Sequence, residues 1–417
     1  MTLIYDFALS VYSLFARVVA IWSPKARCWS RGRRDLFERM AKAIPSGEDI
    51  VWIHVASLGE FEQGRPIIEK IRKEHPEYKI LITFFSPSGY EVRHNYEGAD
   101  YIFYLPVDTS RNVNRFLDIV NPKFAIFVKY EFWLNFLSEL RTRKIKSYIV
   151  SAIFRRNSIF FKPWGFAWRE ALESFEILFV QDENSKELLA EWGFDNAIVA
   201  GDTRFDRVWD IAQNSKQLPI IESFVGNKEM MIAGSSWEPD EEIILPLIEK
   251  NPNIKFIIAP HEIDNDRVSG LISKLKNRGV RYSQCDENTP LNEVQVLVLD
   301  TMGMLSSVYK YAKWGYIGGG FGKGIHNTLE AATFGLPIAF GPNYLKFKEA
   351  CDLVSLGAAT PVTSAQELEE WFSNLQNRQT REAVSIKTLD YTARKRGATS
   401  LITKTIFKSP SKQLSEV

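Results

Sequence analysis

Short apolar runs separated by amphipathic stretches dominate the chain from residue 50 onward. Runs rich in branched and aromatic residues are typical of buried strands, and the stretches between them have the periodicity of helices. Strands that alternate with helices form right-handed βαβ units on a parallel sheet. The predicted strands of the first half are 50–55, 79–83, 101–105, 124–128, 147–150, 177–180 and 197–200. Those of the second half are 230–233, 255–259, 294–299, 313–317 and 337–339.

The two series of strands predict an α/β protein with two doubly wound, Rossmann-like domains. A chain of 417 residues is also too long for one hydrophobic core of the usual size. Ligands of doubly wound sheets bind beyond the carboxyl ends of the strands, so we expect a cleft between two facing sheets. The predicted parts are an N-terminal helix with a basic flank at 1–35, a first domain at 36–205, a second domain at 206–407 and a tail at 408–417.

Composition narrows the functional classes. Hydrophobic residues make up 45% and charged residues 25% of the chain, as in an ordinary folded protein. The net charge of +1 gives no footprint for nucleic-acid binding. Cys28, Cys285 and Cys351 lie far apart without a CxxC pair, which fits a reducing compartment and predicts neither a disulfide framework nor a metal site.

The N-terminal segment 1–22 is apolar over almost the ~20 residues that span a bilayer, although Asp6 and Arg17 interrupt it. A cleaved signal peptide is not expected, because the positive charges follow the apolar run. The segment therefore forms a marginal spanning helix, a helix in the membrane interface, or a helix packed on its own domain. In the first two cases a basic flank would hold the rest of the chain on the cytoplasmic side: Lys25, Arg27, Arg31, Arg33 and Arg34.

A second aromatic segment, residues 159–169, places several rings around Lys162 and Arg169. Aromatic rings with cationic neighbours suit lipid headgroups or the wall of an apolar acceptor groove. Ordinary core packing is an equal alternative.

The stretch 315–330 predicts a phosphate site. It reads as a buried strand, a glycine hinge and the start of a helix near His326 and Asn327. Glycines let a backbone approach an anion closely, and a helix N-terminus presents unpaired N–H groups and a partial positive charge. Glu330, one turn into this helix, is placed to accept hydrogen bonds from a ribose. The glycines alone would also fit a tight structural turn.

The loop after the first strand contains Ser57 and Glu60 in S-x-x-E spacing. This spacing is typical of a capping box, in which Glu60 would only satisfy the backbone N–H of the serine. A carboxylate at the end of the first strand is also suited to take a proton from a nucleophilic hydroxyl. We therefore interpret Glu60 as a catalytic base and Glu62 as the alternative to it.

Polar residues follow other predicted strands of the first half. Ser86 and Ser88 offer hydroxyls at a helix start, or only cap that helix. Lys129 and Glu131 hold an acidic substrate or pair with each other. Arg155 adds a positive corner or belongs to a solvated face.

In the second half, Ser235 and Ser236 follow a strand and precede a helix, where they would meet a phosphate. Backbone groups around Met302 to Met304 follow another strand and would border a base. The stretch 264–266 matches a D-x-D metal pattern, but its place at an expected helix start favours capping.

Together these motifs resemble the 3-deoxy-D-manno-octulosonate (Kdo) transferases of Gram-negative lipid A assembly. Any one motif would be weak, but they follow the order of that family as far as about residue 360. The matching stretches are His54–Glu60, Leu105–Asp108, Lys129–Trp133, Ser235–Ser236, Asp300–Gly303, Gly318–Gly320 and His326–Glu330.

The resemblance implies a GT-B glycosyltransferase with an acceptor-binding first domain and a donor-binding second domain. It implies CMP-Kdo as donor, the lipid A precursor lipid IVA as acceptor, no cofactor or metal, and an inverting transfer in lipopolysaccharide core biosynthesis with Glu60 as base. It also implies attachment to lipids of the inner membrane on the cytoplasmic face. The loops and the resemblance together predict donor contacts from Ser235, Ser236, His261, Met302, Gly303, Met304, Gly320, Lys323, Asn327 and Glu330. Acceptor contacts are predicted from Ser86, Ser88, Lys129, Glu131 and Arg155.

One departure from the family pattern concerns the donor. Pro-Arg-His is expected after a strand of the second domain, whereas residues 259–262 read Ala-Pro-His-Glu. An arginine that would face the donor is therefore missing, and one of four cations would compensate: Arg204, Lys323, Lys346 or Lys348.

Two other functions fit parts of the same pattern. A GT-B enzyme that uses a UDP-sugar would also have a glycine loop and an acidic ribose ligand. A membrane-bound GT-B scaffold without turnover would not need both Glu60 and Glu330. An NAD dehydrogenase fits worse, because no GxGxxG follows the first strand.

Overall fold

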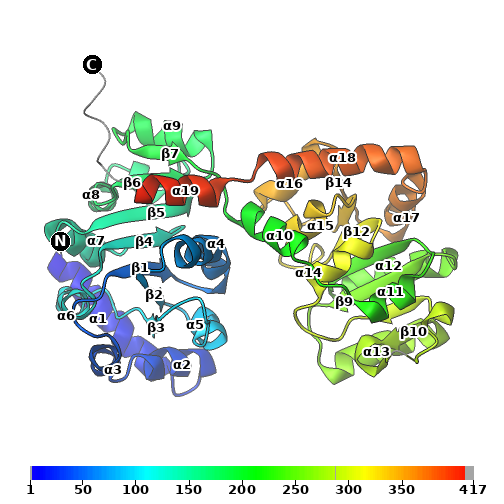
Figure 1. Ribbon diagram of the computed structural model, residues 1–417, viewed down its shortest axis with the longest axis horizontal. Coiled ribbons are helices and arrows are strands. Elements are labelled where there is room, and N and C mark those ends of the chain that lie inside the picture. The colour runs from blue at the N-terminus through cyan, green and yellow to red at the C-terminus, as the bar shows by residue number, and fades with distance from the viewer. Residues whose placement is uncertain (1, 287, 409–417) are drawn as a thin grey trace. The chain divides into compact units, whose positions relative to one another are not determined.

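A computed structural model of the chain describes residues 2–286 and 288–408. The predicted tail at 408–417 lies outside these described residues except for Lys408. The chain divides into two compact units, which we call unit 1 (Met1–Arg207 with Arg396–Val417) and unit 2 (Val208–Lys395). Each unit is a parallel β-sheet with helices between its strands (Figure 1).

Unit 1 has a seven-stranded parallel sheet in the order β3-β2-β1-β4-β5-β6-β7. Alternate residues of its central strand enter two different cores, with Trp52 on one face and Val51, Ile53 and Val55 on the other. Helices thus cover both faces, which explains why its strands read as continuous apolar runs. The strands are β1 Ile50–Val55, β2 Lys79–Phe84, β3 Tyr101–Tyr104, β4 Phe124–Val128, β5 Lys146–Ala152, β6 Ile177–Val180 and β7 Ala197–Val199.

The helices of unit 1 connect these strands and frame them at the N-terminus. They are α1 Thr2–Val19, α2 Pro24–Gly32, α3 Leu36–Ala43, α4 Leu58–Glu74, α5 Pro87–Arg93, α6 Ser110–Val120, α7 Leu134–Thr142, α8 Phe166–Leu172 and α9 Glu183–Glu191. Helix α10, Arg204–Gln213, leads from unit 1 into unit 2, and α19, Ala398–Phe407, belongs again to unit 1.

Unit 2 repeats the same architecture with the strand order β10-β11-β9-β8-β12-β13-β14, all parallel. The strands are β8 Met230–Ser236, β9 Lys255–Pro260, β10 Gly279–Arg281, β11 Val296–Val298, β12 Trp314–Ile317, β13 Ile338–Phe340 and β14 Ala359–Pro361. The helices are α11 Pro219–Val225, α12 Glu238–Lys250, α13 Asn265–Leu275, α14 Leu305–Val308, α15 Leu329–Thr333, α16 Lys348–Ser355, α17 Ala365–Asn374 and α18 Arg378–Arg394.

The C-terminal helix departs from the predicted boundaries, which assigned residues 206–407 to the second domain. Ile402 is fully buried in a core of unit 1, and the ring of Phe407 stacks on His75 with the centroids 3.7 Å apart. Asp206 accepts hydrogen bonds from the backbone N–H groups of Gly397 and Thr399, each at 2.7 Å. Residues 396–407 therefore complete unit 1, because the apolar face of α19 is buried there.

Helix α1 is attached to unit 1 through its first turns. Asp6, which interrupts the apolar run, accepts hydrogen bonds from the Ser110 hydroxyl at 2.8 Å and from the Asn135 side chain at 2.6 Å. Within the part of the chain that the structure describes, no helix combines the length and apolarity of a membrane crossing. The outward side of α1 nevertheless carries exposed apolar side chains at helical spacing: Ile4, Phe7, Val11, Leu14, Phe15 and Val18. We call this set the α1 stripe.

Candidate functional site

Several of the predicted site residues lie at the ends of the strands where each sheet changes its winding direction. In unit 1 this switch point lies between β1 and β4, and in unit 2 it lies between β8 and β12. Ligands of doubly wound sheets bind beyond the carboxyl ends of the strands at such points. Glu60 and Glu131 follow β1 and β4, Ser236 ends β8, and Gly320 follows β12. Each unit thus carries its own group of candidate residues.

Glu60 lies in the first turn of α4, immediately beyond β1. Ser57 is the N-cap residue of this helix, but its side chain caps no backbone N–H group. The Ser57 hydroxyl instead donates a hydrogen bond to the Glu60 carboxylate. The capping-box interpretation is therefore not the arrangement seen, and the helix N-terminus favours negative charge at Glu60.

Glu62, the alternative base, has a different environment. Its carboxylate lies 2.8 Å from the Arg93 guanidinium and within 3.9 Å of Arg65 and Arg207. Among the described residues Glu60 forms no ion pair of this kind. The arginines already engage the Glu62 carboxylate, so the geometry favours Glu60 over Glu62 as base.

Glu131 belongs to a buried polar network at the ends of β1 and β4. The Trp133 indole donates to its carboxylate at 2.7 Å, and the same carboxylate oxygen lies 3.0 Å from His54 Nε2. On the other side of the imidazole, Nδ1 lies 2.9 Å from the Thr83 hydroxyl, which accepts a hydrogen bond from the Trp52 indole at 2.8 Å. These contacts fix the orientation of Glu131. The expected alternative, a pair with Lys129, does not occur among the described residues.

The remaining predicted acceptor residues are less connected. Ser86 is the N-cap of α5, and its hydroxyl lies 3.0 Å from that of Ser88 and 3.3 Å from the Ser88 backbone N–H, so it acts as a cap. Lys129 has the left-handed backbone angle φ of 73°, and its ammonium lies 5.6 Å from the centre of the Tyr130 ring. Arg155 is exposed beyond β5.

Two glycines of the segment after β12 are required by packing. A Cβ on Gly318 would lie 2.2 Å from the Ser235 carbonyl oxygen, and one on Gly320 would lie 2.6 Å from the Cα of Gly341. The segment is fixed further by buried Asp240, whose carboxylate accepts the Gly319 N–H at 2.9 Å. Neighbouring backbone therefore occupies the space that these glycines leave free.

Three rings stack beside this segment. The centroids of His261 and His326 are 4.2 Å apart, and those of Trp237 and His261 are 4.9 Å apart. The Trp237 indole donates to His326 Nε2 at 3.0 Å. Burial lowers the pKa of His326 to about 4, with a contribution from the nearby His261. His326 is therefore neutral at pH 7, with its remaining proton on Nδ1. The sequence did not reveal this pairing with Trp237.

Glu330 and Asn327 lie together at the start of α15. The Asn327 side chain donates to the Glu330 carboxylate at 3.1 Å, and its Oδ1 accepts the Leu329 backbone N–H at 3.0 Å. The helix itself begins later than predicted, at Leu329 rather than near His326, because Asn327 bonds this backbone N–H and Thr328 is the N-cap. Glu330 consequently lies in the first turn of a short helix.

The two serines that the sequence placed after a strand are the last two residues of β8, and they differ in their surroundings. Ser236 is buried and its hydroxyl donates to Glu241 at 2.9 Å, whereas Ser235 is half-buried with φ of 54°. Such a backbone angle is strained for a residue with a side chain, and it coincides with the register shift between β8 and β9 at this point. After β11, Met302 is 82% exposed, Gly303 has φ of 82° and Met304 precedes α14.

The cations that could replace the missing arginine are not equivalent. Arg204 lies in unit 1 and pairs with Asp202 at 2.7 Å. Lys348 lies 3.5 Å from a carboxylate one helical turn along α16. Lys323 and Lys346 are exposed and form no ion pair within the described residues, and Lys323 is closer in sequence to Glu330. The D-x-D stretch serves as a cap, because the Asp264 side chain accepts a backbone N–H of α13.

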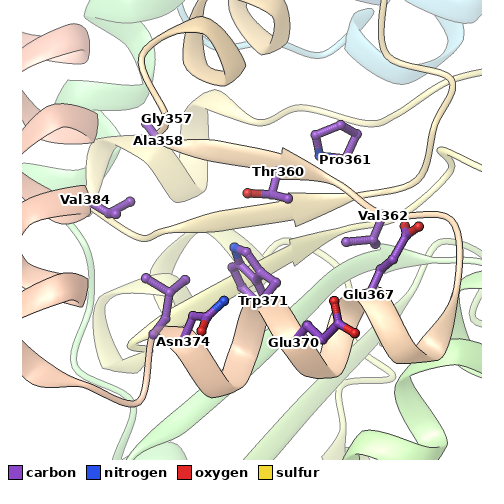
Figure 2. A pocket seen from close by; sticks show the side chains of 11 residues that line it. Gly357, Ala358, Thr360, Pro361, Val362, Glu367, Glu370, Trp371, Asn374 and Val384 are labelled. Atoms are coloured by element: carbon purple, nitrogen blue, oxygen red, sulfur yellow. The ribbon is translucent and has the colours of Figure 1, made fainter.

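A separate pocket of about 430 Å³ lies in unit 2 between β14 and α17 (Figure 2). Its wall includes Thr360, Trp371 and Asn374, and none of the predicted donor residues lines it. One of its carboxylates, Glu367, accepts the Thr363 backbone N–H at 2.7 Å and thereby serves the start of α17. We assign no site to this pocket.

The sequence is similar to one family of enzymes. Residues 33–207 match the family model described as 3-deoxy-D-manno-octulosonic-acid transferase (kdotransferase). The 3-deoxy-D-manno-octulosonic acid transferase of Haemophilus influenzae is 26% identical over 349 residues, which cover 80% of each chain. The protein of that name from Aquifex aeolicus is 27% identical over 334 residues, which cover 78% of this chain and 86% of that protein.

Solved structures share the fold over most of the chain. The UDP-GlcNAc 2-epimerase from Neisseria meningitidis aligns with a TM-score of 0.61 at 18% identity, covering 87% of this chain and 100% of that one. MurG from Acinetobacter baumannii aligns with a TM-score of 0.54 at 13% identity, covering 87% of this chain and 100% of that one. The two parallel-sheet units, taken with these relatives, define a glycosyltransferase with a GT-B-like fold. In its sequence the chain is similar to the 3-deoxy-D-manno-octulosonic acid transferase family.

Proposed function

We propose that the protein transfers Kdo from CMP-Kdo to a lipid A precursor, with inversion at the anomeric carbon and without a metal ion. The proposal is supported by the family model that residues 33–207 match and carried by one observation, the carboxylate of Glu60 beyond β1. The relatives from Haemophilus influenzae and Aquifex aeolicus are named as 3-deoxy-D-manno-octulosonic acid transferases, which supports Kdo as the transferred sugar. Lipid IVA as the acceptor is inferred from the family resemblance.

In the proposed reaction, Glu60 removes the proton from an acceptor hydroxyl while that oxygen attacks the anomeric carbon of Kdo. A carbon–oxygen bond forms, and the bond from the anomeric carbon to the phosphate oxygen of CMP-Kdo breaks. CMP leaves with the electron pair, and the proton stays on Glu60. Glu131, oriented by His54 and Trp133, is then placed to hold a polar group of the acceptor.

The segment of unit 2 that carries Lys323, Asn327 and Glu330 is proposed to bind the CMP part. Negative charge grows on the leaving phosphate as the bond breaks, and the ammonium of Lys323 and backbone N–H groups would stabilise it. His326, being neutral, contributes a hydrogen-bond donor from Nδ1 rather than a charge. The ribose hydroxyls would donate to Glu330.

Incubation with CMP-Kdo and a tetraacylated lipid A precursor, followed by mass spectrometry of the lipid, tests the proposed function directly. We expect the lipid mass to rise by whole Kdo units. The matched control replaces CMP-Kdo with a UDP-sugar, and a product formed only in that control would contradict the proposal in favour of a UDP-sugar enzyme.

Replacement of Glu330 by alanine should weaken CMP binding by roughly 1–3 kcal/mol, the usual worth of hydrogen bonds to a charged group. Calorimetric titration with CMP measures this change. Glu242→Ala, which removes an exposed carboxylate from α12, should leave the affinity unchanged. Equal CMP affinity of wild type and a folded Glu330→Ala variant would remove Glu330 from the donor site.

We further propose that α1 lies in the interface of the inner membrane, on its cytoplasmic face. Six exposed apolar side chains of the α1 stripe share one side of the helix, and basic residues follow it. A helix of this kind buries its apolar side at the boundary between headgroups and acyl chains. The lipid-linked acceptor is found at the same boundary.

Substitution of Phe7 and Phe15 by serine should reduce binding to lipid vesicles by roughly tenfold or more, because both exposed rings lose their burial in lipid. Flotation of the full chain with vesicles measures the effect. Ile386→Ser provides the control, since this exposed side chain belongs to α18 of unit 2. Unchanged flotation of the Phe7→Ser/Phe15→Ser variant would exclude an interfacial α1.

A further inference from the structure

A polar cavity of about 720 Å³ lies in unit 1 between α1, α2 and the segment that leads into α6. Its wall carries Arg17, Arg33 and Arg34, together with the carboxylate of Asp35. Among the residues that the structure describes, no ion pair joins any of these arginines to a carboxylate. The wall therefore carries more positive charge than its own carboxylate neutralises.

Arg33 is the most enclosed of the three arginines. Its guanidinium donates to the carbonyl oxygens of Leu105 at 2.9 Å, Phe85 at 2.9 Å and Trp29 at 3.1 Å. It also lies 4.1 Å from the centre of the Trp29 ring. All of these partners are neutral, and burial lowers the pKa of Arg33 to about 9. An enclosed cation without a counter-charge favours an anion nearby.

Trp29 adds a second observation on the same wall. Its side chain is 6% exposed, and its indole N–H has no hydrogen-bond acceptor among the described atoms. Buried polar groups in folded proteins are normally paired. The wall thus contains both a cation without a counter-charge and a donor without an acceptor.

The cavity adjoins the α1 stripe. Leu14 belongs to the stripe and also lines the cavity, and Ser10, Ser13 and Arg17 lie next to it on α1. A lipid whose acyl chains lie along the stripe therefore has its headgroup at the mouth of the cavity. A free anion would make no favourable contact with the apolar side chains beside the cavity.

We propose that this cavity binds a phosphate group carried by a lipid, held by Arg17 and Arg34 with Arg33 behind them. Arginine side chains fit the oxygens of a phosphate in a forked arrangement, and Ser13 and Ser30 supply neutral donors on the same wall. The inference rests on the interfacial position of α1 proposed above. It extends that function by adding a headgroup site distinct from Glu60 and from the donor segment.

Calorimetric titration of the full chain with dihexanoyl phosphatidic acid, kept below its micelle concentration, tests the site. We expect saturable binding to the wild type. The Arg17→Gln/Arg34→Gln variant should bind roughly thirtyfold more weakly, because it loses two basic contacts of the usual strength. Arg31→Gln removes an exposed charge from α2 outside the cavity and should change the affinity by less than about fivefold. Both altered arginines are exposed, so the variant should keep the thermal stability of the wild type.

Three results would overturn the proposal. They are that the wild type fails to bind the lipid phosphate, that Arg31→Gln weakens binding as much as the double variant does, and that inorganic phosphate binds as tightly as the lipid. The first removes the site, the second reduces it to general surface charge, and the third makes it a site for free phosphate.

Two further measurements identify the source of the phosphate. If bilayer lipids supply it, the double variant floats less with phosphatidic acid vesicles and keeps its KM for a detergent-dispersed acceptor. If the acceptor supplies it, that KM rises. A transfer assay of the double variant in detergent separates failure of this site from failure of the proposed function. Kdo transfer with unchanged kcat leaves the proposed function intact, whatever the lipid titration shows.

Discussion

Glu60→Gln is expected to lower kcat for Kdo transfer by on the order of 10²–10⁴, the usual contribution of a positioned general base. An amide cannot take the proton of the acceptor hydroxyl. The thermal stability should stay near that of the wild type, because the glutamine oxygen still accepts the hydrogen bond of the Ser57 hydroxyl. A transfer assay with CMP-Kdo, together with thermal unfolding and CMP titration, measures all three properties.

Glu62→Gln is the matched control, two residues along the same helix. The Glu62 carboxylate is held by Arg93, Arg65 and Arg207, so its loss should affect ion pairs and leave transfer within a few-fold of wild type. Transfer by Glu60→Gln within a few-fold of wild type would contradict the assignment. The search would then move to Glu62 or Glu131.

The sequence predicted the sheets well because nearly all of their strands are buried on both faces. Strand β1 occupies 50–55 as expected, and its residues alternate between two cores. Strands β10 and β14 were not predicted. Each has three residues at an edge of its sheet, and Gly279, Arg281 and Pro361 give no apolar run. Edge strands as short as these depend on pairing with their neighbours rather than on a local pattern.

Topology also explains why the places of the candidate residues in the fold were predictable. Parallel strands place all of their C-terminal loops at one edge of the sheet, so residues such as Glu60 and Glu330 could be assigned to the site region from order alone. The side-chain partners could not be assigned. Sequence spacing suggested that Lys129 and Glu131 pair, but the structure brings His54, 77 residues away, to Glu131. Partners so distant are fixed only by the tertiary fold.

Asp6 shows the same limit at the N-terminus. Within the sequence it only interrupts an apolar segment, whereas in the structure it binds Ser110 and Asn135 and fastens α1 to unit 1. The carboxylate therefore leaves the other side of α1 free to carry the apolar stripe. A charge that weakens a spanning helix is thus compatible with a helix that lies on a surface.

Asp108 in the stretch Leu105–Asp108 provides the second attachment of α1 and the largest expected effect on stability. Its buried carboxylate accepts hydrogen bonds from the Tyr5 hydroxyl at 2.9 Å and from the backbone N–H groups of Asn135 at 3.1 Å and Phe136 at 2.9 Å. The last two groups belong to the first turn of α7, whose N-cap residue makes no side-chain cap. Asp108→Ala should therefore cost roughly 3–5 kcal/mol of unfolding free energy, since buried donors lose their acceptor.

The stability contributed by Asp108 should also depend on pH. Burial raises the pKa of Asp108 from 3.8 to about 7, although its three donors oppose this shift. The folded state thus binds the proton more tightly than the unfolded state, so the contribution is complete below about pH 4 and declines as the pH rises through about 7. The unfolding free energy of the wild type should accordingly fall relative to that of Asp108→Asn between pH 5 and pH 8, as denaturant unfolding measures. If the unfolding free energy of the wild type instead rises with pH relative to that of Asp108→Asn, the ionised carboxylate, stabilised by its donors, is the form that holds α1 and α7 together.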